Sequence, residues 1–410
     1  MHLYDLPLAF ALVGLALYTV LGGADFGAGF WQLVAGRGDQ AREIRDHSHD
    51  AMAPVWEANH VWLVFVLTVV WTAYPAAFGS IASTFSIPLF LAGIGIVLRG
   101  GAYALRAGTA TPRERRRVDT VFALSSVLTP FALGTVAGGI ASARVRVGNP
   151  GGSLVSSWLN PTSLTIGVLA VASAAYLAAV FLSGDAVRDR HPELAERFRL
   201  RALATGLAAG AVALAGIVVL RFDAHLLFTH LTQGVGLPAL IISVLAGVAT
   251  LALVWRRRYE PARYSAALAV AATVAGWSLA QRPRFLADLT VEQAAAGHNT
   301  QIAVVVAVLA GAVILFPSLA LLFRLTLAGR LTGPELAAPA ASPRDPIPAT
   351  TARSARLAAA SLIAGIGLLT VAEAGWAHAL GVVSLLAFVA CGYRALLPGD
   401  VEHPRPAKER

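Results

Sequence analysis

Four ionisable side chains stand inside otherwise apolar stretches of the sequence, at Asp25, Glu57, His60 and Arg99. A charged side chain at the centre of a membrane span costs roughly 2.5–3.5 kcal/mol on insertion scales, and it usually faces the protein interior or water. Because Glu57 and His60 are three residues apart, they share one face of a helix. Carboxylates and an imidazole that lead into a membrane can accept and release protons in turn. These residue types therefore indicate a proton path.

The composition points to a bilayer as the solvent. Of 410 residues, 57% are hydrophobic and 13% are charged, whereas soluble proteins keep roughly a quarter of their residues charged. The net charge of +9 comes from Arg clusters between apolar runs, which favours anchored cytoplasmic loops over nucleic-acid binding. The single Cys391 excludes a disulfide framework and a Cys-based metal site. Residues Met1–Pro7 lack a basic region, so we expect no cleaved signal peptide.

The elements that must position these residues are membrane helices, which need about 20 apolar residues each. Nine runs are long enough: Leu6–Val34, Val55–Tyr74, Ser80–Leu105, Val118–Ala141, Leu164–Leu182, Leu200–Leu220, Val235–Trp255, Tyr264–Leu279 and Gln301–Leu325. Two shorter runs, Leu357–Val371 and Ala377–Tyr393, follow a Pro-rich stretch. We predict an all-α membrane protein with a nine-helix core over 1–325, a cytoplasmic linker over 326–355, an extra transmembrane hairpin over 356–394 and a cytoplasmic tail over 395–410.

Arginine-rich and arginine-poor loops alternate without a break along the chain. The rich loops and termini lie at 37–45, 106–117, 188–201, 256–263, in the linker and in the tail. Because basic loops stay in the cytoplasm, the pattern places the N-terminus outside and the C-terminus inside. An odd number of spans fits this arrangement, and eleven fits best.

This topology places the charged residues in the cytoplasmic half of the bilayer. Asp25 falls about two-thirds along the first helix. Glu57 is expected in the first turn of the second helix, Arg99 in the inner half of the third, and Asp119 at the start of the fourth. His60 and Trp62 would lie about 5–8 Å deeper than Glu57, at about 1.5 Å per residue.

Structural roles compete with the proton path for each of these residues. Asp25 and Arg99 could be an ion pair that locks two helices. Glu57 and Asp119 could each cap a helix, because acids are favoured at helix N-termini. His60 could bond to a neighbouring backbone group. Support for His60 as a haem ligand is weak, because no second histidine forms a matched axial pair with it.

The sequence resembles subunit II of the cytochrome bd-type quinol oxidases over roughly residues 1–325. The specific element is Pro54-x-Trp56-Glu57-x-Asn59-x-x-Trp62-Leu63. Supporting positions are the Gly-rich segment around Asp25, Tyr74-Pro75 with Phe78, Arg99, Asp119 with Ser125, Ser126 and Gly134, and the stretch from Arg282-Pro283 to Ala296.

The resemblance implies a fold of two four-helix bundles plus a peripheral helix. It implies a respiratory complex in the cytoplasmic (inner) membrane that oxidises quinol and reduces oxygen to water, with protons drawn from the cytoplasm. A similarly folded subunit I would bind haem b, haem d and the quinol, and this chain would bind no cofactor. The chain would stabilise that partner and contribute proton-path acids, to which Asp25 and Glu57 correspond, while Trp62 corresponds to a residue near an oxygen-access route.

The chain departs from the family pattern in three places. Gly22 stands where some members have an additional acid, and His60 replaces other polar residues. One fewer acid would make the route depend more on Glu57 and His60. The hairpin after Ser354 is outside the pattern.

Two other function classes remain open from the sequence. A proton-coupled secondary transporter would also need many helices and buried acids, although the Gly-rich segment of the first helix has no counterpart in a later one. A membrane scaffold without a pathway is the third hypothesis.

Overall fold

The computed structural model describes residues 2–327 except 37, 107–108, 110 and 149–152, and beyond them residue 353, parts of 356–368 and 375–396. The chain divides into two compact units, Met1–Phe316 and Pro317–Arg410. Almost all described residues are helical, which confirms the all-α prediction. The exception is a small antiparallel pair of strands, β1 (Arg284–Leu286) and β2 (Leu289–Thr290).

The described helices follow one another in the order of the chain. Their bounds are α1 (Asp5–Val34), α2 (Asp39–Ala73), α3 (Pro75–Thr84), α4 (Ser86–Arg106), α5 (Pro112–Ala141), α6 (Pro161–Arg188), α7 (Pro192–Asp223), α8 (His225–Gln233), α9 (Leu237–Trp255), α10 (Tyr259–Gln281), α11 (Val291–Ala294), α12 (His298–Leu327) and α14 (Gly375–Leu396).

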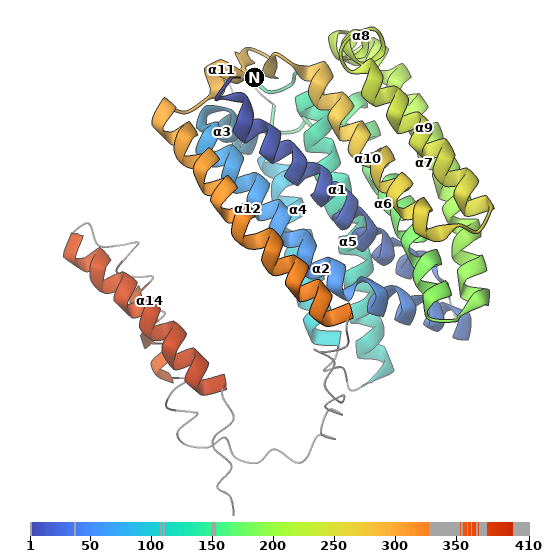
Figure 1. Cartoon of the computed structure of the whole chain (residues 1–410), viewed down its shortest axis with the longest axis horizontal. Coiled ribbons are helices and arrows are strands. Elements are labelled where there is room, and N and C mark those ends of the chain that lie inside the picture. Colours follow the sequence, from blue (N-terminus) through green and yellow to red (C-terminus); the bar gives the residue numbers. More distant parts are fainter. Residues whose placement is uncertain are drawn as a thin grey trace, which may run out of the picture. The chain divides into compact units, whose positions relative to one another are not determined.

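Helix contacts in the first unit form two groups. Helices α1, α2, α4 and α5 pack in one group, and α6, α7, α9 and α10 pack in the other. Helices α1 and α5 both pack against α6 and so join the groups, and Figure 1 shows α1 between them. This grouping agrees with the expected pair of four-helix bundles.

Most of the predicted spans are helices of membrane-crossing length. Among the described residues, seven helices are long and apolar enough to cross a bilayer, and the bent pair Asn59–Ala73 and Pro75–Thr84 raises the number to eight. Helix α10 covers the predicted span Tyr264–Leu279 but is not among these helices, because charged and polar side chains near its two ends, such as Glu260, Arg263 and Gln281, lower its mean hydropathy. The chain is thus a multi-pass membrane protein.

Helix α2 begins at Asp39, well before the predicted start at Val55. The added turns are amphipathic, because Ala41, Ile44 and Ser48 are buried on one face at a helical spacing. The prediction that Glu57 lies in the first turn is therefore wrong. Glu57 lies about five turns into α2, at 3.6 residues per turn, so it does not cap the helix.

The third predicted span is divided into α3 and α4 at Phe85. A proline clashes with the carbonyl four residues before it and cannot donate a hydrogen bond to it. Pro88 therefore prevents a regular helix at Thr84. The Ser157 hydroxyl donates to the freed Thr84 carbonyl at 3.4 Å, which gives this buried backbone group a partner.

The described residues cover only part of the chain beyond the predicted core. Helix α14 contains the predicted run Ala377–Tyr393. The run Leu357–Val371 is described in part, and most of the linker and the whole segment 397–410 lie outside the described residues. The linker, hairpin and tail assignments remain predictions.

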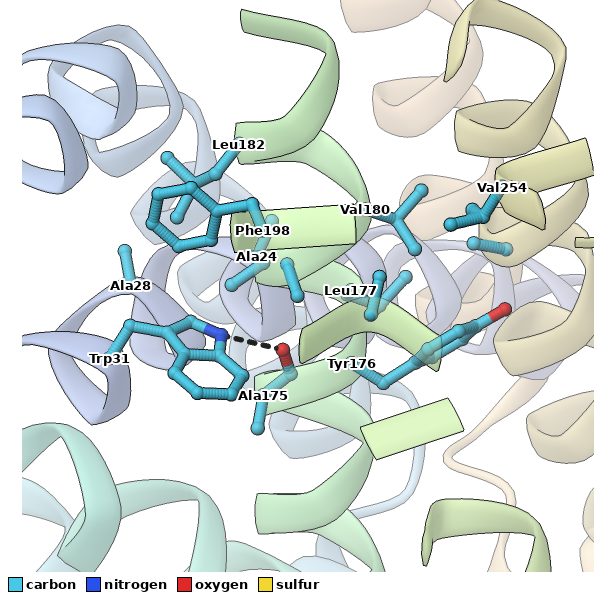
Figure 2. Close-up of a cluster of buried hydrophobic side chains, with 14 of the residues drawn as sticks. Ala24, Ala28, Trp31, Ala175, Tyr176, Leu177, Val180, Leu182, Phe198 and Val254 are labelled. Carbon is cyan, nitrogen blue, oxygen red and sulfur yellow. Dashed lines mark hydrogen bonds between the residues drawn. The ribbon is translucent and has the colours of Figure 1, made fainter. Parts of the chain in front are cut away.

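Small residues allow α1 and α6 to approach closely at the centre of the first unit. Figure 2 shows Ala24, Ala28 and Trp31 of α1 beside Leu177 of α6, with the Trp31 indole N–H donating to the Ala175 carbonyl at 2.9 Å. A Cβ at Gly27 would collide with the Ala174 carbonyl. Glycines therefore fix how closely the two groups of helices can pack.

We expect Gly27→Ala to destabilise the protein by about 1–3 kcal/mol, because the added methyl group must displace the α6 backbone. The measurement is thermal unfolding of the purified membrane complex. Gly93→Ala on α4 is the matched control, since a Cβ there meets nothing within 4 Å. Equal melting temperatures for the two variants would contradict this account of the packing.

Candidate proton-transfer site

Asp25 of α1 and Arg99 of α4 form an ion pair in the interior, and each residue is 1% exposed. The Arg99 guanidinium also donates from Nη2 to the Asp25 backbone carbonyl at 2.9 Å. The Asn59 side chain of α2 donates from Nδ2 to the Asp25 carboxylate at 3.2 Å. Three helices therefore meet at one carboxylate, and the ion-pair alternative from the sequence is observed.

Helix α5 provides the other partners of Arg99. Nη1 of Arg99 donates to the Ser126 hydroxyl, which in turn donates to the Phe122 carbonyl at 2.5 Å. The guanidinium carbon lies 4.1 Å from the centre of the Phe122 ring and 5.0 Å from that of Phe26. Cation–π contacts of this kind are strengthened by desolvation. Arg99 is thus held by charge, hydrogen bonds and aromatic faces together.

The glycine-rich segment around Asp25 leaves room for this polar cluster. A Cβ at Gly29 would collide with Ser126 and lie 3.0 Å from Nη1 of Arg99. A Cβ at Gly22 would lie 3.2 Å from the Asn59 side-chain oxygen. An acidic side chain at position 22 would require Asn59 to move.

A second charged cluster lies nearer the end of the bundle that the Arg pattern assigns to the cytoplasm. Arg106 of α4 contacts Asp119 of α5 at 3.0 Å and Asp46 of α2 at 2.9 Å. Arg115 also reaches Asp46, at 3.1 Å. These pairs connect α2, α4 and α5.

Asp119 does not cap its helix, so that alternative is wrong. Helix α5 begins at Pro112, and the cap consists of the Thr111 hydroxyl and the Glu114 carboxylate, each bonded to the other's backbone N–H. Asp119 lies two turns further on and pairs with Arg106. Asp119 was predicted at the start of the helix because the polar first turns of α5 lie outside the apolar run.

The remaining predicted site residues lie on α2. The His60 imidazole interacts electrostatically with Asp25. Trp62 packs with Tyr18 and Phe26 beside the ion pair. The Glu57 backbone is helical, but its side chain lies outside the described residues. The structure thus brings Asp25, Arg99, His60 and Trp62 together.

Two further side chains belong to the site, Asn59 and Ser126. Both were part of the motifs quoted from the sequence, but neither carried a predicted role. Asn59 is fully buried, and a buried amide needs hydrogen-bond partners. An amide next to acids in an apolar span was the signal that could have identified it.

Comparisons with known proteins identify the family of the chain. The family model for cytochrome bd terminal oxidase subunit II matches residues 4–326. The chain belongs to this family. Cytochrome bd-I ubiquinol oxidase subunit 2 of Escherichia coli (strain K12) is 26% identical over 218 residues, which cover 51% of this chain and 55% of that protein. Cytochrome bd ubiquinol oxidase subunit 2 of Bacillus subtilis (strain 168) is 26% identical over 134 residues, or 33% of this chain and 39% of that protein.

A solved structure, that of the bd oxidase from Geobacillus thermodenitrificans, contains a similar chain. The TM-score is 0.63 and the identity 26%, over 80% of this chain and 99% of the other. As a cytochrome bd subunit II, the chain is part of an oxidoreductase complex. This membership does not favour the transporter hypothesis.

Two described histidines and the rings beside Arg99 have partners within the chain. Among the described residues, no group of three or more His, Cys, Asp or Glu side chains could hold a metal ion. His47 and His230 each lie within hydrogen-bonding distance of a backbone carbonyl oxygen. The space beside Arg99 is filled by Phe26 and Phe122.

We expect Asp25→Asn to destabilise subunit II by about 3–5 kcal/mol, because removal of one partner leaves a buried, unpaired charge. The double variant Asp25→Asn/Arg99→Gln should lose less than the sum of the two single variants. The measurement is thermal unfolding of the purified complex.

Asp39→Asn provides the control, since Asp39 pairs with Arg42 on an exposed surface and should cause no measurable loss. Additive losses in the double variant would show that Asp25 and Arg99 contribute independently.

Proposed function

We propose that subunit II stabilises a haem-bearing partner subunit and helps deliver cytoplasmic protons to the site where that complex reduces oxygen to water with electrons from quinol. One observation carries the proposal. A buried carboxylate, Asp25, lies beside an Asn and an Arg on three helices, and a charged cluster around Arg106 lies between it and the predicted cytoplasmic end. Buried ionisable groups in a membrane are by default functional candidates.

The proposed orientation has the N-terminus outside and the C-terminus inside. It rests on the alternation of Arg-rich and Arg-poor loops. The Asp46–Arg106–Asp119 cluster then faces the cytoplasm, which supplies the protons. The complex would lie in the cytoplasmic membrane.

The redox centres, haem b and haem d, would lie in the partner, together with the quinol site. This assignment is supported by the membership of the chain in the subunit II family. The chemistry left to this chain is the transfer of protons and the support of the partner. Trp62, which packs beside Phe26, would lie near an oxygen-access route.

Within this proposal, protons pass through acids that can be both protonated and deprotonated. Glu57 lies about three turns beyond Asp46 on α2, or roughly 16 Å at 1.5 Å per residue. Asp119 is already engaged by Arg106. Glu57 should therefore limit proton delivery more than Asp119.

We expect Glu57→Ala to slow quinol-dependent oxygen reduction more than Asp119→Ala, by on the order of tenfold or more, since a positioned proton-transfer group contributes about a hundredfold or more in enzymes. The measurement is oxygen uptake by the purified complex, with the haem absorption spectrum as the test of assembly. Equal rates in two fully assembled variants would overturn this order.

Deletion of the chain after Ala355 should leave the haem absorption of the complex unchanged, because the family match ends at residue 326. The truncated subunit is co-purified with its partner and compared with the full chain at equal protein concentration. A loss of haem would show that the C-terminal segment supports the partner.

A further inference from the structure

Side chains of α2, α4 and α5 form three layers between the predicted cytoplasmic end and the buried ion pair. The outer layer is Asp46, Arg106 and Asp119, joined by the contacts of Arg106. The inner layer is Arg99 and Ser126, bonded to each other. From one layer to the next, the residue position changes by three and then by four, both on α4 and on α5. Residues at this spacing lie on one face of a helix.

The middle layer contains His49 of α2, Tyr103 of α4 and Phe122 of α5. The His49 ring centre lies 4.9 Å from that of Tyr103 and 6.4 Å from that of Phe122. Phe122 also contacts the Arg99 guanidinium of the inner layer. His49 therefore lies between the charged outer layer and the site of Asp25.

The chemistry of this position is specific to an imidazole. Tyrosine holds its proton near neutral pH and phenylalanine has none to exchange, whereas an imidazole in water titrates near pH 6.5. Its two ring nitrogens allow it to accept a proton at one and release a proton from the other. From Arg106 to Arg99 is about 10 Å along α4, at 1.5 Å per residue, which is too far for one hydrogen bond.

We propose that His49 is a proton-relay residue between the Asp46–Arg106–Asp119 cluster and the Asp25–Arg99 pair. A proton from the outer layer binds one ring nitrogen, and the other nitrogen releases a proton inward through water. The imidazole is then the other tautomer, and rotation of the ring restores the starting form. The proposal rests on the proposed role of this subunit in proton delivery and adds a carrier that the sequence motifs did not include.

The second half of the route follows the same face of α2. His60 is eleven residues after His49, which is close to three full turns of a helix. The two imidazoles therefore share a face, and His60 is the one that interacts electrostatically with Asp25. The rings of Tyr103 from α4 and Phe122 from α5 face His49. The charged groups three residues further out on the three helices are Arg106, Asp119 and Asp46.

A neighbouring histidine provides the matched control. His47 is two residues from His49 but points to α6 and α7, where its Nε2 lies 3.2 Å from the Leu182 carbonyl oxygen and its ring centre lies 5.8 Å from that of Phe198. Its Nδ1 also lies 3.7 Å from the Asp189 carboxylate at the end of α6, so the contacts of His47 in the described part of the chain are on the α6 and α7 side. His47→Gln changes the same residue type at nearly the same depth.

The experiment compares His49→Gln and His47→Gln in the complete complex, by quinol-dependent oxygen uptake from pH 6 to pH 8.5. The His49 variant should lose activity on the order of tenfold at pH 8 and less at pH 6, because bulk protons become scarcer as pH rises. Millimolar free imidazole should restore part of the rate at pH 8. His47→Gln should keep the wild-type profile.

Haem absorption tests assembly of each complex, and His49→Asn replaces His49→Gln if that variant does not assemble. A wild-type profile for the His49 variant overturns the proposal. So does a uniform loss that is independent of pH and insensitive to imidazole, since it would mean that His49 only packs against Tyr103. If the His49→Gln complex has normal oxygen uptake while the Glu57→Ala complex is slow, only the proposed role of His49 is wrong. If both variants have normal oxygen uptake, the proposed function in proton delivery is wrong as well.

Discussion

The ion pair between Asp25 and Arg99 is buried where α1, α4 and α5 meet, and its burial constrains the helices around it. Moving two charges out of water is repaid only if every remaining donor and acceptor finds a partner. Asn59, Ser126 and the Asp25 carbonyl supply most of those partners. The glycines of α1 provide the necessary space. The packing of four helices thus depends on the requirements of one carboxylate and one guanidinium.

Much of this arrangement could be predicted from the sequence, because apolar length identifies membrane helices and a charge within such a run indicates a buried site. Asp25 and Arg99 were recognised individually, with their pairing as an alternative. The errors arose where a helix continues beyond the apolar run. Because the amphipathic start of α2 lies outside the apolar run, Glu57 was predicted too near the end of that helix. The charged start of α5 lies outside its apolar run in the same way, so Asp119 was considered a cap. Hydropathy indicates which residues lie in lipid, whereas a helix can extend beyond the lipid until a capping residue or a proline ends it.

The site also shows what single-residue reasoning omits. Arg106 has an ordinary position at the end of an apolar run, yet it joins Asp46 of α2 to Asp119 of α5. His49 lies in a polar stretch that has no hydropathy signal. Their importance comes from which helices face one another, and this depends on long-range packing of α1 against α5 and α6. The polar layers of this subunit II therefore form only when its helices pack together.

The spacing of the ion-pair partners along the chain has a consequence for synthesis. Arg99 is 74 residues after Asp25, so at about 5–20 residues per second the ribosome delivers it roughly 4–15 s later. During that interval the first helix has a carboxylate and no arginine to neutralise it. Asn59 follows Asp25 by only 34 residues and is the first of its partners to emerge. An amide on the second helix can thus hold the nascent hairpin together in the translocation machinery until the cation arrives.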